Sequence, residues 1–269
     1  MKSSFHICIV CCAVLFSAIS TTQSASADLL LDLRAISVSG TDVSLVNSKS
    51  VNVTNSSGGG MIDFELYAVV NGTDGSALNE GFQTYTARLV SRNTTGGAVL
   101  GDLLNSDSTG GALPRGLLSP FNSAGSAAGA LQDLDADTDL DLGSLNDGSF
   151  SSWIGGRAAS MQPYSGGGSS AEFLLYRFSM NLADIQAPAI GATTDVVVEG
   201  RDIATAFLWQ EDGGASIQAG ASDSRVSFSP AVVITNVSPI PEPSSVALAL
   251  VGSAMLGIAI RRRNRLAQG

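Results

Sequence analysis

The sequence predicts an all-β protein, built as an antiparallel β-sandwich of jelly-roll or immunoglobulin-like type. Three observations support this fold class: apolar and polar residues alternate in many short segments, Gly, Asn, Asp and Pro turn signals separate these segments, and no long segment carries an apolar stripe of helical period. We expect seven to ten short strands, flanked by an N-terminal signal helix and a C-terminal transmembrane helix.

Residues 1–27 have the form of a secretory signal peptide. Lys2 supplies a cationic start, an apolar stretch runs from Ile7 to Ile19, and Ala25 and Ala27 form a small-x-small ending. A buried N-terminal helix is the alternative, but the charged start and small-residue ending favour a signal. We therefore expect export, with cleavage by signal peptidase before Asp28.

Cleavage there would remove a large part of the usual catalytic chemistry. The three cysteines and the only histidine lie inside the signal, at His6, Cys8, Cys11 and Cys12. Without them the exported protein has no disulfide, no thiolate nucleophile, no imidazole base and no Cys or His metal ligand. Carboxylates or a Ser-Lys pair are the groups that remain for catalysis. Lys49 is the only lysine between signal and tail, and its Ser/Asn/Thr-rich surroundings (Asn47 to Ser57) indicate a solvated surface residue.

Residues 28–236 are predicted to form the exported β-sandwich domain. The alternation is clearest from Glu172 to Leu182, where Leu174, Tyr176, Phe178, Met180 and Leu182 would share one face. The other expected strands have the same pattern and are Leu31–Val38, Met61–Val70, Gln83–Val90, Asp195–Glu199, Ile203–Gln210 and Arg225–Thr235.

Residues 93–148 differ in composition from the strands around them. Glycine, serine, alanine and leucine dominate up to residue 130, Pro114 and Pro120 interrupt the segment, and an Asp-rich stretch follows. This composition predicts long loops, first Gly/Ser-rich and then Asp-rich.

The charge of the domain excludes one class of partner. Residues 28–240 hold 23 acidic and nine basic side chains, a net charge of about −14. Such a surface repels phosphate backbones, so we expect no nucleic-acid binding. It suits an extracellular protein that binds divalent cations.

The Asp-rich stretch is the one constellation with clear metal chemistry. Asp133, Asp135, Asp137 and Asp139 alternate along the chain, and hard oxygen ligands at this spacing suit Ca²⁺. The match to an EF-hand loop is partial, since Thr138 stands where glycine is needed and Ser144 where a bidentate carboxylate is needed. The alternative is a solvated acidic loop or an edge strand that deters aggregation. The ion would stiffen the loop and take no part in catalysis.

Two weaker constellations point to carbohydrate. Trp153, Tyr164 and Trp209 would form a sugar-stacking platform of a carbohydrate-binding module for exopolysaccharide if they were exposed, although a tryptophan in such a domain is more often core. A carboxylate-based glycosidase would need two of four strand carboxylates. These are Asp63, Glu65, Glu172 and Glu199, and their ordinary role would be to pair with Arg88, Arg177 or Arg201.

Residues 237–269 have the form of a membrane-targeting tail. Pro241, Glu242 and Pro243 form a short rigid tripeptide, and an apolar segment follows at 244–260. The basic end consists of Arg261, Arg262, Arg263 and Arg265. The apolar run from Val246 to Ile260 spans only about 22 Å as a helix, so on hydropathy alone it also fits an interfacial segment. The flanking motifs favour a transmembrane anchor with its basic end in the cytoplasm.

The segment Val237 to Ser245, followed by the apolar span and the arginine cluster, resembles the PEP-CTERM sorting signal of Gram-negative bacteria. This resemblance implies export by the general secretory route, then recognition and cleavage near the tripeptide by an exosortase-type membrane transpeptidase. It also implies an association with extracellular polysaccharide and the biofilm matrix. We therefore expect an exported protein that is first membrane-anchored and then lies at the cell surface or outside the cell.

The domain itself is similar, more loosely, to exported β-rich domains that carry this tail in planctomycete-type bacteria. The likeness rests on the strand Phe64 to Val70, the Asp-rich loop and the turn around Trp209, Glu211, Asp212 and Gly213. It implies no catalytic residues. The sequence thus predicts a non-catalytic surface or matrix protein, with the carbohydrate-binding module and the glycosidase as alternatives.

Overall fold

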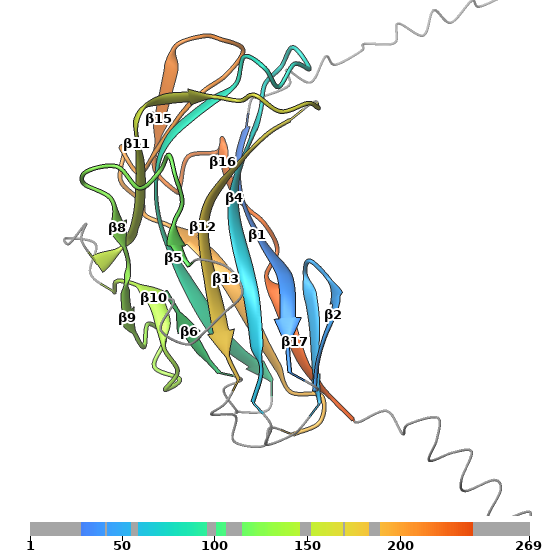
Figure 1. Cartoon of the computed structure of the whole chain (residues 1–269). Coiled ribbons are helices and arrows are strands. Elements are labelled where there is room, and N and C mark those ends of the chain that lie inside the picture. Colours follow the sequence, from blue (N-terminus) through green and yellow to red (C-terminus); the bar gives the residue numbers. More distant parts are fainter. Residues whose placement is uncertain are drawn as a thin grey trace, which may run out of the picture.

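The computed structural model describes residues 28–40, 42–54, 59–95, 101–105, 115–145, 152–168, 170–182 and 189–238, and it is all-β (Figure 1). The expected signal peptide with Ala25 and Ala27, the tripeptide, the apolar segment 244–260 and the basic end all lie outside these residues. Within the part that is described, no helix is long and apolar enough to cross a membrane.

The smaller of two sheets is formed around the first strand of the domain. Its strand order is β16-β1-β4-β12-β6, with β7 beside β12, and β1 pairs with β4 over nearly its whole length. The strands are β1 (Asp28–Ser39), β4 (Met61–Asn71), β6 (Asp102–Leu104), β7 (Gly116–Leu117), β12 (Ala171–Asn181) and β16 (Val226–Phe228).

The larger sheet is formed around β5 (Gly81–Thr95), which is 15 residues long. Its order is β15-β14-β5-β13-β17-β3-β2, and β10 and β11 also pair with β5. Short strands β8 and β9 extend it beside β11 and β10. The remaining strands are β2 (Val43–Asn47), β3 (Ser50–Thr54), β8 (Ala127–Ala128), β9 (Ala130–Gln132), β10 (Asp141–Gly143), β11 (Ile154–Pro163), β13 (Thr193–Gly200), β14 (Phe207–Gln210), β15 (Ser216–Ala219) and β17 (Val232–Val237).

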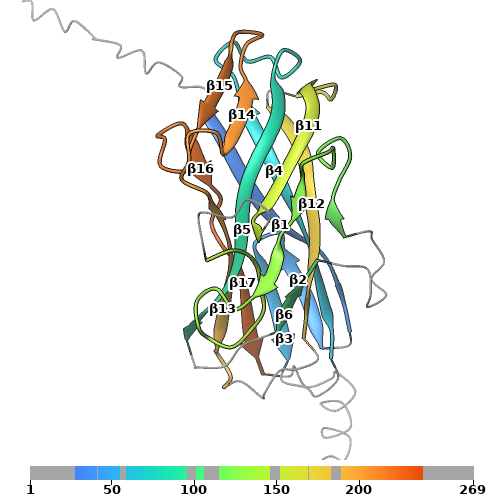
Figure 2. The same cartoon turned by 90° about the vertical axis from the view of Figure 1, so that its left-hand side faces the viewer.

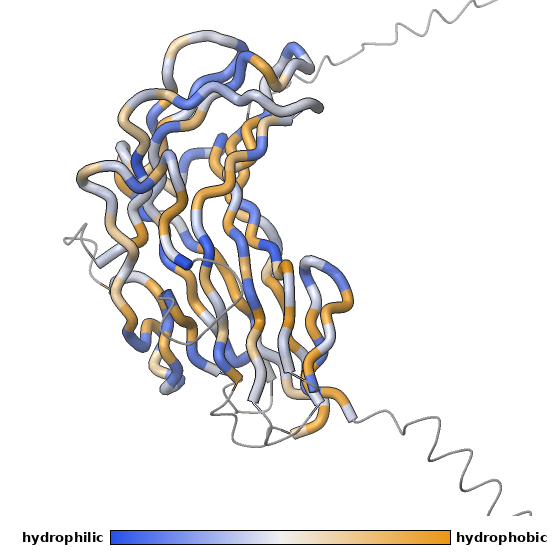
Figure 3. The backbone as a smooth tube through the Cα atoms, in the orientation of Figure 1, coloured by the Kyte–Doolittle hydropathy of each residue, from blue (hydrophilic) through white to orange (hydrophobic). Residues whose placement is uncertain are grey.

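The two sheets pack on each other around one hydrophobic core. The ring of Phe82 in β5 lies 5.8 Å from that of Phe173 in β12, and the Tyr85 hydroxyl donates a hydrogen bond to the carbonyl of Leu175 across the same interface. Figure 3 shows apolar and polar residues following one another along the strands, as expected when one face of each sheet is buried. Burial of each large side chain contributes about 1.5–3 kcal/mol. The jelly-roll or immunoglobulin-like type of this arrangement stays a prediction.

The sheets are mixed, which corrects the expectation of purely antiparallel pairing. The pairs β1–β16 and β17–β3 are parallel. The expected strand Arg225–Thr235 is in fact two strands, because the chain leaves the smaller sheet after β16, passes Ser229 and Pro230, and enters the larger sheet as β17. The expected strand Ile203–Gln210 begins only at Phe207.

A bulge in β12 changes the face that the sequence pattern predicted. The register against β4 shifts between Leu174 and Tyr176, so Leu175 and Tyr176 are both buried while Leu174 is half-buried. The extra residue reverses the alternation, and the prediction that Leu174 shares a face with Tyr176 was therefore wrong. The expectation of only loops in 93–148 was also wrong, since β6 to β10 lie within this segment.

Lys49 is not the solvated residue that the sequence predicted. It lies in the turn between β2 and β3, and its Nζ atom donates hydrogen bonds to Asp32 Oδ1 at 2.7 Å, to Ser229 Oγ at 2.8 Å and to the carbonyl of Leu33. Its own carbonyl accepts a hydrogen bond from the Val233 N–H of β17. Burial acts to raise the pKa of Asp32, but the hydrogen bonds from Lys49 and Arg34 outweigh it and lower that pKa. Lys49 thus connects both sheets at the point where the chain crosses between them.

Replacing Lys49 by methionine is expected to lower the free energy of unfolding by about 1–3 kcal/mol, because Asp32 then keeps a largely buried charge with one cationic partner fewer. The pKa of Asp32 lies below its ordinary value of 3.8, so this contribution is present above that pH and is lost as the pH falls through the lowered pKa. Urea unfolding of the full chain measures the effect at neutral and acidic pH. Arg157→Met removes the same charge at an exposed position of β11 and is the control. Equal urea midpoints for Lys49→Met and the unchanged chain at neutral pH would contradict the role given to Lys49.

Candidate functional site

The Asp-rich loop joins β9 to β10 and lies against the second half of β5. Leu142 of β10 pairs with Leu89 of β5, and the β9–β10 hairpin lies beside β5 (Figure 1). Within the loop, Asp139 contacts Ser91 of β5. The same loop contacts β6, since Asp102 Oδ1 accepts a hydrogen bond from the Leu140 N–H. The loop is therefore held at one end of the domain by β5 of the larger sheet and β6 of the smaller one.

Asp133 organises the tip of this loop. Its two carboxylate oxygens accept hydrogen bonds from the N–H groups of Ala136 at 2.7 Å and Thr138 at 3.1 Å. Ala136 and Thr138 both adopt positive φ, 66° and 85°. This backbone is unfavourable for residues other than glycine, and for a β-branched threonine above all. Thr138 thus adopts the positive φ that favours glycine, in the place where an EF-hand loop has one.

Asp139 and Asp141 form the buried floor of the loop. Ser91 Oγ lies 2.7 Å from Asp139 Oδ2 and 3.0 Å from Asp141 Oδ1, and the Ser91 N–H donates to the same Asp141 oxygen at 2.7 Å. The second Asp141 oxygen accepts a hydrogen bond from the Leu134 N–H. Asp139 and Asp141 are 1% and 0% exposed. Asp141 belongs to the site although the sequence analysis did not count it among the ligands.

Two carboxylate oxygens in this loop are buried without a donor. Asp139 Oδ1 and Asp137 Oδ2 make no hydrogen bond within the described residues. Burial, and then the neighbouring negative charges, raise the pKa of Asp135 and Asp139, with the hydrogen bond from Ser91 opposing the shift at Asp139. A buried carboxylate that lacks a donor is costly, and a cation beside it removes that cost.

Two overlapping groups of three carboxylates in this loop have the spacing of ligands around a cation. One oxygen each of Asp135, Asp137 and Asp139 lies within 4.8 Å of the others, and so does one oxygen each of Asp133, Asp135 and Asp141. Ca²⁺–oxygen distances of about 2.3–2.6 Å place two ligands of one ion up to about 5 Å apart. The structure thus brings together all four Asp residues that the sequence predicted, together with Asp141.

The expected sugar-stacking platform is not present at its predicted residues. Trp153 and Trp209 are 2% and 0% exposed, so both are core residues, which is the more common case for a tryptophan in such a domain, and the exposure that the platform required is missing. Trp153 lies beside the guanidinium groups of Arg88 and Arg201, and the half-buried ring of Tyr164 packs edge-on against Phe173. These aromatic side chains belong to the core or its margin.

The four strand carboxylates each lie beside an arginine, but only Glu65 and Glu199 lie beside arginines that the sequence analysis named. Asp63 also accepts hydrogen bonds from the hydroxyls of Ser37 and Ser179. The shortest charged contacts are 2.7 Å for Glu65 with Arg177, 2.7 Å for Glu199 with Arg88, 2.9 Å for Glu172 with Arg34 and 3.9 Å for Asp63 with Arg115.

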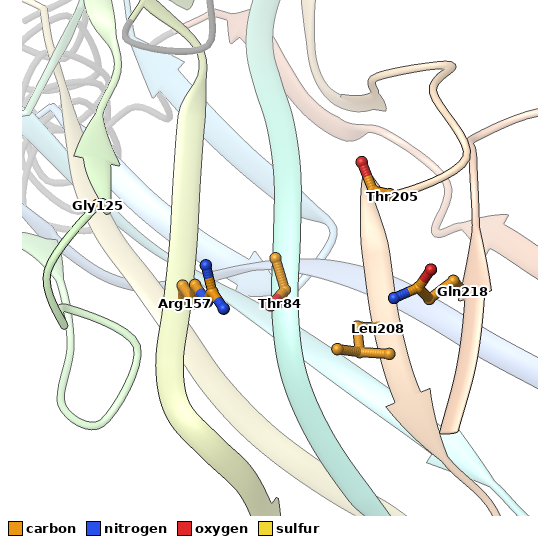
Figure 4. A pocket seen from close by; sticks show the side chains of 6 residues that line it. All are labelled: Thr84, Gly125, Arg157, Thr205, Leu208 and Gln218. Atoms are coloured by element: carbon orange, nitrogen blue, oxygen red, sulfur yellow. The ribbon is translucent and has the colours of Figure 1, made fainter. Parts of the chain in front are cut away.

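A shallow groove of about 300 Å³ lies on the outer face of the larger sheet (Figure 4). Arg157 of β11, Thr84 of β5 and Gln218 of β15 line it, together with Leu208, Gly125 and Thr205. These residues come from segments far apart in the sequence and meet only because the strands pair. The sequence analysis found no sign of this groove.

β17 is the last strand of the described residues, and the candidate sorting segment follows it in the sequence. Residues 239–263 match the PEP-CTERM protein-sorting motif. The match includes Pro241, Glu242, Pro243 and the first three arginines of the basic end, while Arg265 lies beyond it. PEP-CTERM signals are recognised by exosortase, a membrane enzyme, so the chain is an exported, exosortase-processed protein of the cell surface. Comparisons with curated proteins and with solved structures gave no match.

Proposed function

We propose that this chain is a non-catalytic structural protein of the cell surface or extracellular matrix, membrane-anchored through its tail before processing, and that its Asp-rich loop binds Ca²⁺. The observation that carries the Ca²⁺ proposal is the buried, donor-free oxygen of Asp139 in one of two groups of three carboxylates that share Asp135. Bound Ca²⁺ would fix the β9–β10 loop against β5 and would stiffen one end of the sheet. An association with extracellular polysaccharide and the biofilm matrix is part of this proposal.

Electrostatics favours the ion over a bare loop. Two like charges 4 Å apart repel by about 4 kcal/mol at an effective dielectric constant of about 20. The carboxylates of Asp135, Asp137 and Asp139 approach within 4.8 Å, so such repulsions act between several pairs at once. A divalent cation between the carboxylates attracts each of them, and these attractions outweigh the repulsion. An extracellular protein meets enough Ca²⁺ for a site of millimolar affinity.

The polar groups of the domain support a non-catalytic role. The carboxylates that a glycosidase would need lie beside arginines. Lys49 Nζ and Ser229 Oγ are 2.8 Å apart, the spacing of a Ser-Lys pair, but Lys49 Nζ also lies 2.7 Å from Asp32 Oδ1 in an ion pair. Ser229 Oγ accepts hydrogen bonds from Lys49 and from the Leu33 N–H. A lysine that donates to the hydroxyl is not arranged to accept its proton, as a base would.

Ca²⁺ at about ten times its Kd is expected to raise the melting temperature of the full chain, because an ion that binds only the folded state then stabilises it by about 1.4 kcal/mol. Asp139→Asn is expected to weaken this response by at least about tenfold in the Ca²⁺ concentration required, since it replaces a carboxyl group of the buried floor of the loop by an amide, which is a weaker ligand for Ca²⁺. Differential scanning calorimetry with and without a chelator measures both.

The matched control is Asp202→Asn, which removes the same charge at an exposed position where the side chain accepts hydrogen bonds from Ser222. Its Ca²⁺ response should equal that of the unchanged chain. A melting temperature that does not respond to Ca²⁺ in the unchanged chain, or an equal response in Asp139→Asn, would refute Ca²⁺ binding by this loop.

Deleting residues 239–269 is expected to move the protein from the cell surface to the medium, because the sorting segment is then missing. Fractionation of producing cells followed by immunoblotting measures the distribution. A second variant that replaces only Pro241, Glu242 and Pro243 by alanine separates recognition of the tripeptide from removal of the apolar segment. Retention of the deleted form at the surface would show that the tail is not the attachment device.

A carbohydrate-binding module is the second candidate function, and the groove of Figure 4 favours it. Its hydroxyl, amide and guanidinium groups suit an extracellular polysaccharide that carries acidic groups, because Arg157 offers an exposed positive charge in an acidic protein. The groove replaces the aromatic platform as the place where such a ligand would bind.

Arg157→Ala is expected to reduce retention on the producing cell's own acidic polysaccharide by about tenfold, the loss that corresponds to one charge-assisted contact of about 1.4 kcal/mol. Affinity electrophoresis in gels with and without that polysaccharide measures it. Arg225→Ala removes a charge of the same sign away from the groove and serves as the control. Unretarded migration of the unchanged chain would remove this candidate.

A further inference from the structure

We propose a second Ca²⁺ site, formed by Asp74, Glu80 and Asp212 with the side-chain oxygen of Asn79, at the opposite end of β5 from the Asp-rich loop. It rests on residues that share nothing with that loop, so it does not depend on the function proposed above. The ligands come from the β4–β5 loop and from the turn between β14 and β15, which lie side by side at one end of the domain (Figure 2).

The sheet brings these two loops together. β5 begins at Gly81, which pairs with Gln210 at the end of β14. The turn that follows is hydrogen-bonded to the β4–β5 loop, because the Gly213 N–H donates to the Asn79 carbonyl at 2.9 Å and the Asp212 N–H donates to Glu80 Oε1 at 3.1 Å. One carboxylate oxygen each of Asp74, Glu80 and Asp212 lies within 4.8 Å of the others.

Glu80 supplies the observation that points to a ligand. The residue is 1% exposed, and its Oε2 atom makes no hydrogen bond within the described residues. A buried carboxylate oxygen without a donor costs several kcal/mol unless a cation or a donor faces it. The side-chain oxygen of the neighbouring Asn79 is likewise buried without a donor. Two orphaned oxygen atoms on adjacent residues, beside two further carboxylates, are an acceptor-only set of the kind that Ca²⁺ prefers.

The surrounding hydrogen bonds orient the ligands. Asp212 accepts hydrogen bonds from the N–H and hydroxyl of Thr73, and Asp74 accepts one from the Ser76 N–H. The Asn79 amide nitrogen donates to Asp74 Oδ2 at 2.7 Å, which leaves the Asn79 oxygen as the free acceptor of that side chain. Supporting contacts of this kind fix carboxylates around metal ions.

Gly72 provides the space for this arrangement. A Cβ atom at this position would lie 1.9 Å from Glu80 Oε1 and 2.3 Å from Asp212 Oδ1, far inside contact distance. The backbone therefore approaches the two carboxylates so closely that only glycine fits. Gly72→Ala is thus a variant that displaces the carboxylates without removing any of them.

Burial, and then the charges of Asp212, Glu211 and Asp74, raise the pKa of Glu80 to about 7, against the hydrogen bond from the Asp212 backbone. The competing explanation is a protonated, neutral Glu80 that needs no ion. A measurement of Ca²⁺ binding distinguishes the two explanations, because a neutral Glu80 predicts no Ca²⁺ binding at this end of the domain.

Titration calorimetry with calcium chloride on the full chain tests the proposal. Asp139→Asn, which disables the Asp-rich loop, is expected to keep one bound ion, and Glu80→Gln in that background is expected to bind at least about tenfold more weakly. Gly72→Ala in the same background should show a similar loss. Glu211→Gln is the control, because it removes the same charge one residue from Asp212 and keeps an acceptor for the Trp209 N–H.

Terbium luminescence adds a readout of location. The Trp209 ring nitrogen donates to Glu211, next to the ligand Asp212, so Tb³⁺ at this site should be sensitised by tryptophan excitation. The signal should survive Asp139→Asn and fall in Glu80→Gln. Absence of Ca²⁺ binding in Asp139→Asn, or unchanged binding after Glu80→Gln with intact circular dichroism, would overturn the second site. A loss of Ca²⁺ binding that is confined to the Asp-rich loop would be consistent with the second site.

Discussion

The contact of Lys49 with Asp32, Leu33 and Ser229 is the constraint on which the two-sheet arrangement depends. Its Nζ atom bonds the first strand of the smaller sheet, while its carbonyl accepts from Val233 of the larger sheet. The chain changes sheets at this point, between β16 and β17, and polar backbone groups at such a crossing need partners. In a domain rich in carboxylates, this one lysine supplies three donors where an acidic side chain would supply none.

β5 connects the part of the domain that Lys49 orders with both acidic clusters. These are the Asp-rich loop and the group of Asp74, Glu80 and Asp212. Glu80 directly precedes the strand and Ser91 lies in its second half, so the clusters are separated by roughly 35 Å at the usual rise of a strand. The same strand is buried between neighbours on both sides and against Phe173 of the other sheet. Its rigidity holds the carboxylates close together. Their mutual repulsion would push them apart if the loops were free to spread.

Much of the fold could be predicted from the sequence, because alternation marks strands such as β4, β5 and β12 directly. The bulge after Leu174 and the break at Ser229 could not, since both arise from packing between strands. The Asp-rich loop was recognisable because its ligands are contiguous in sequence. Glu80 and Asp212 stand 132 positions apart and only sheet pairing joins them. The sequence around Trp153 and Trp209 is compatible with an exposed or a buried side chain, so only the structure shows that both are buried.

The last strand before the tail has a consequence for how the protein bears load. β17 is held between β3, parallel to it over five paired positions, and β13, antiparallel over four. A pull on the segment that follows Val237 acts along these strands. The backbone hydrogen bonds on both sides of β17 are therefore loaded together in shear, and they do not break one after another as they would if the strand were peeled away. The resistance of the domain to such a pull is governed by its unfolding rate, and equilibrium stability alone does not describe it.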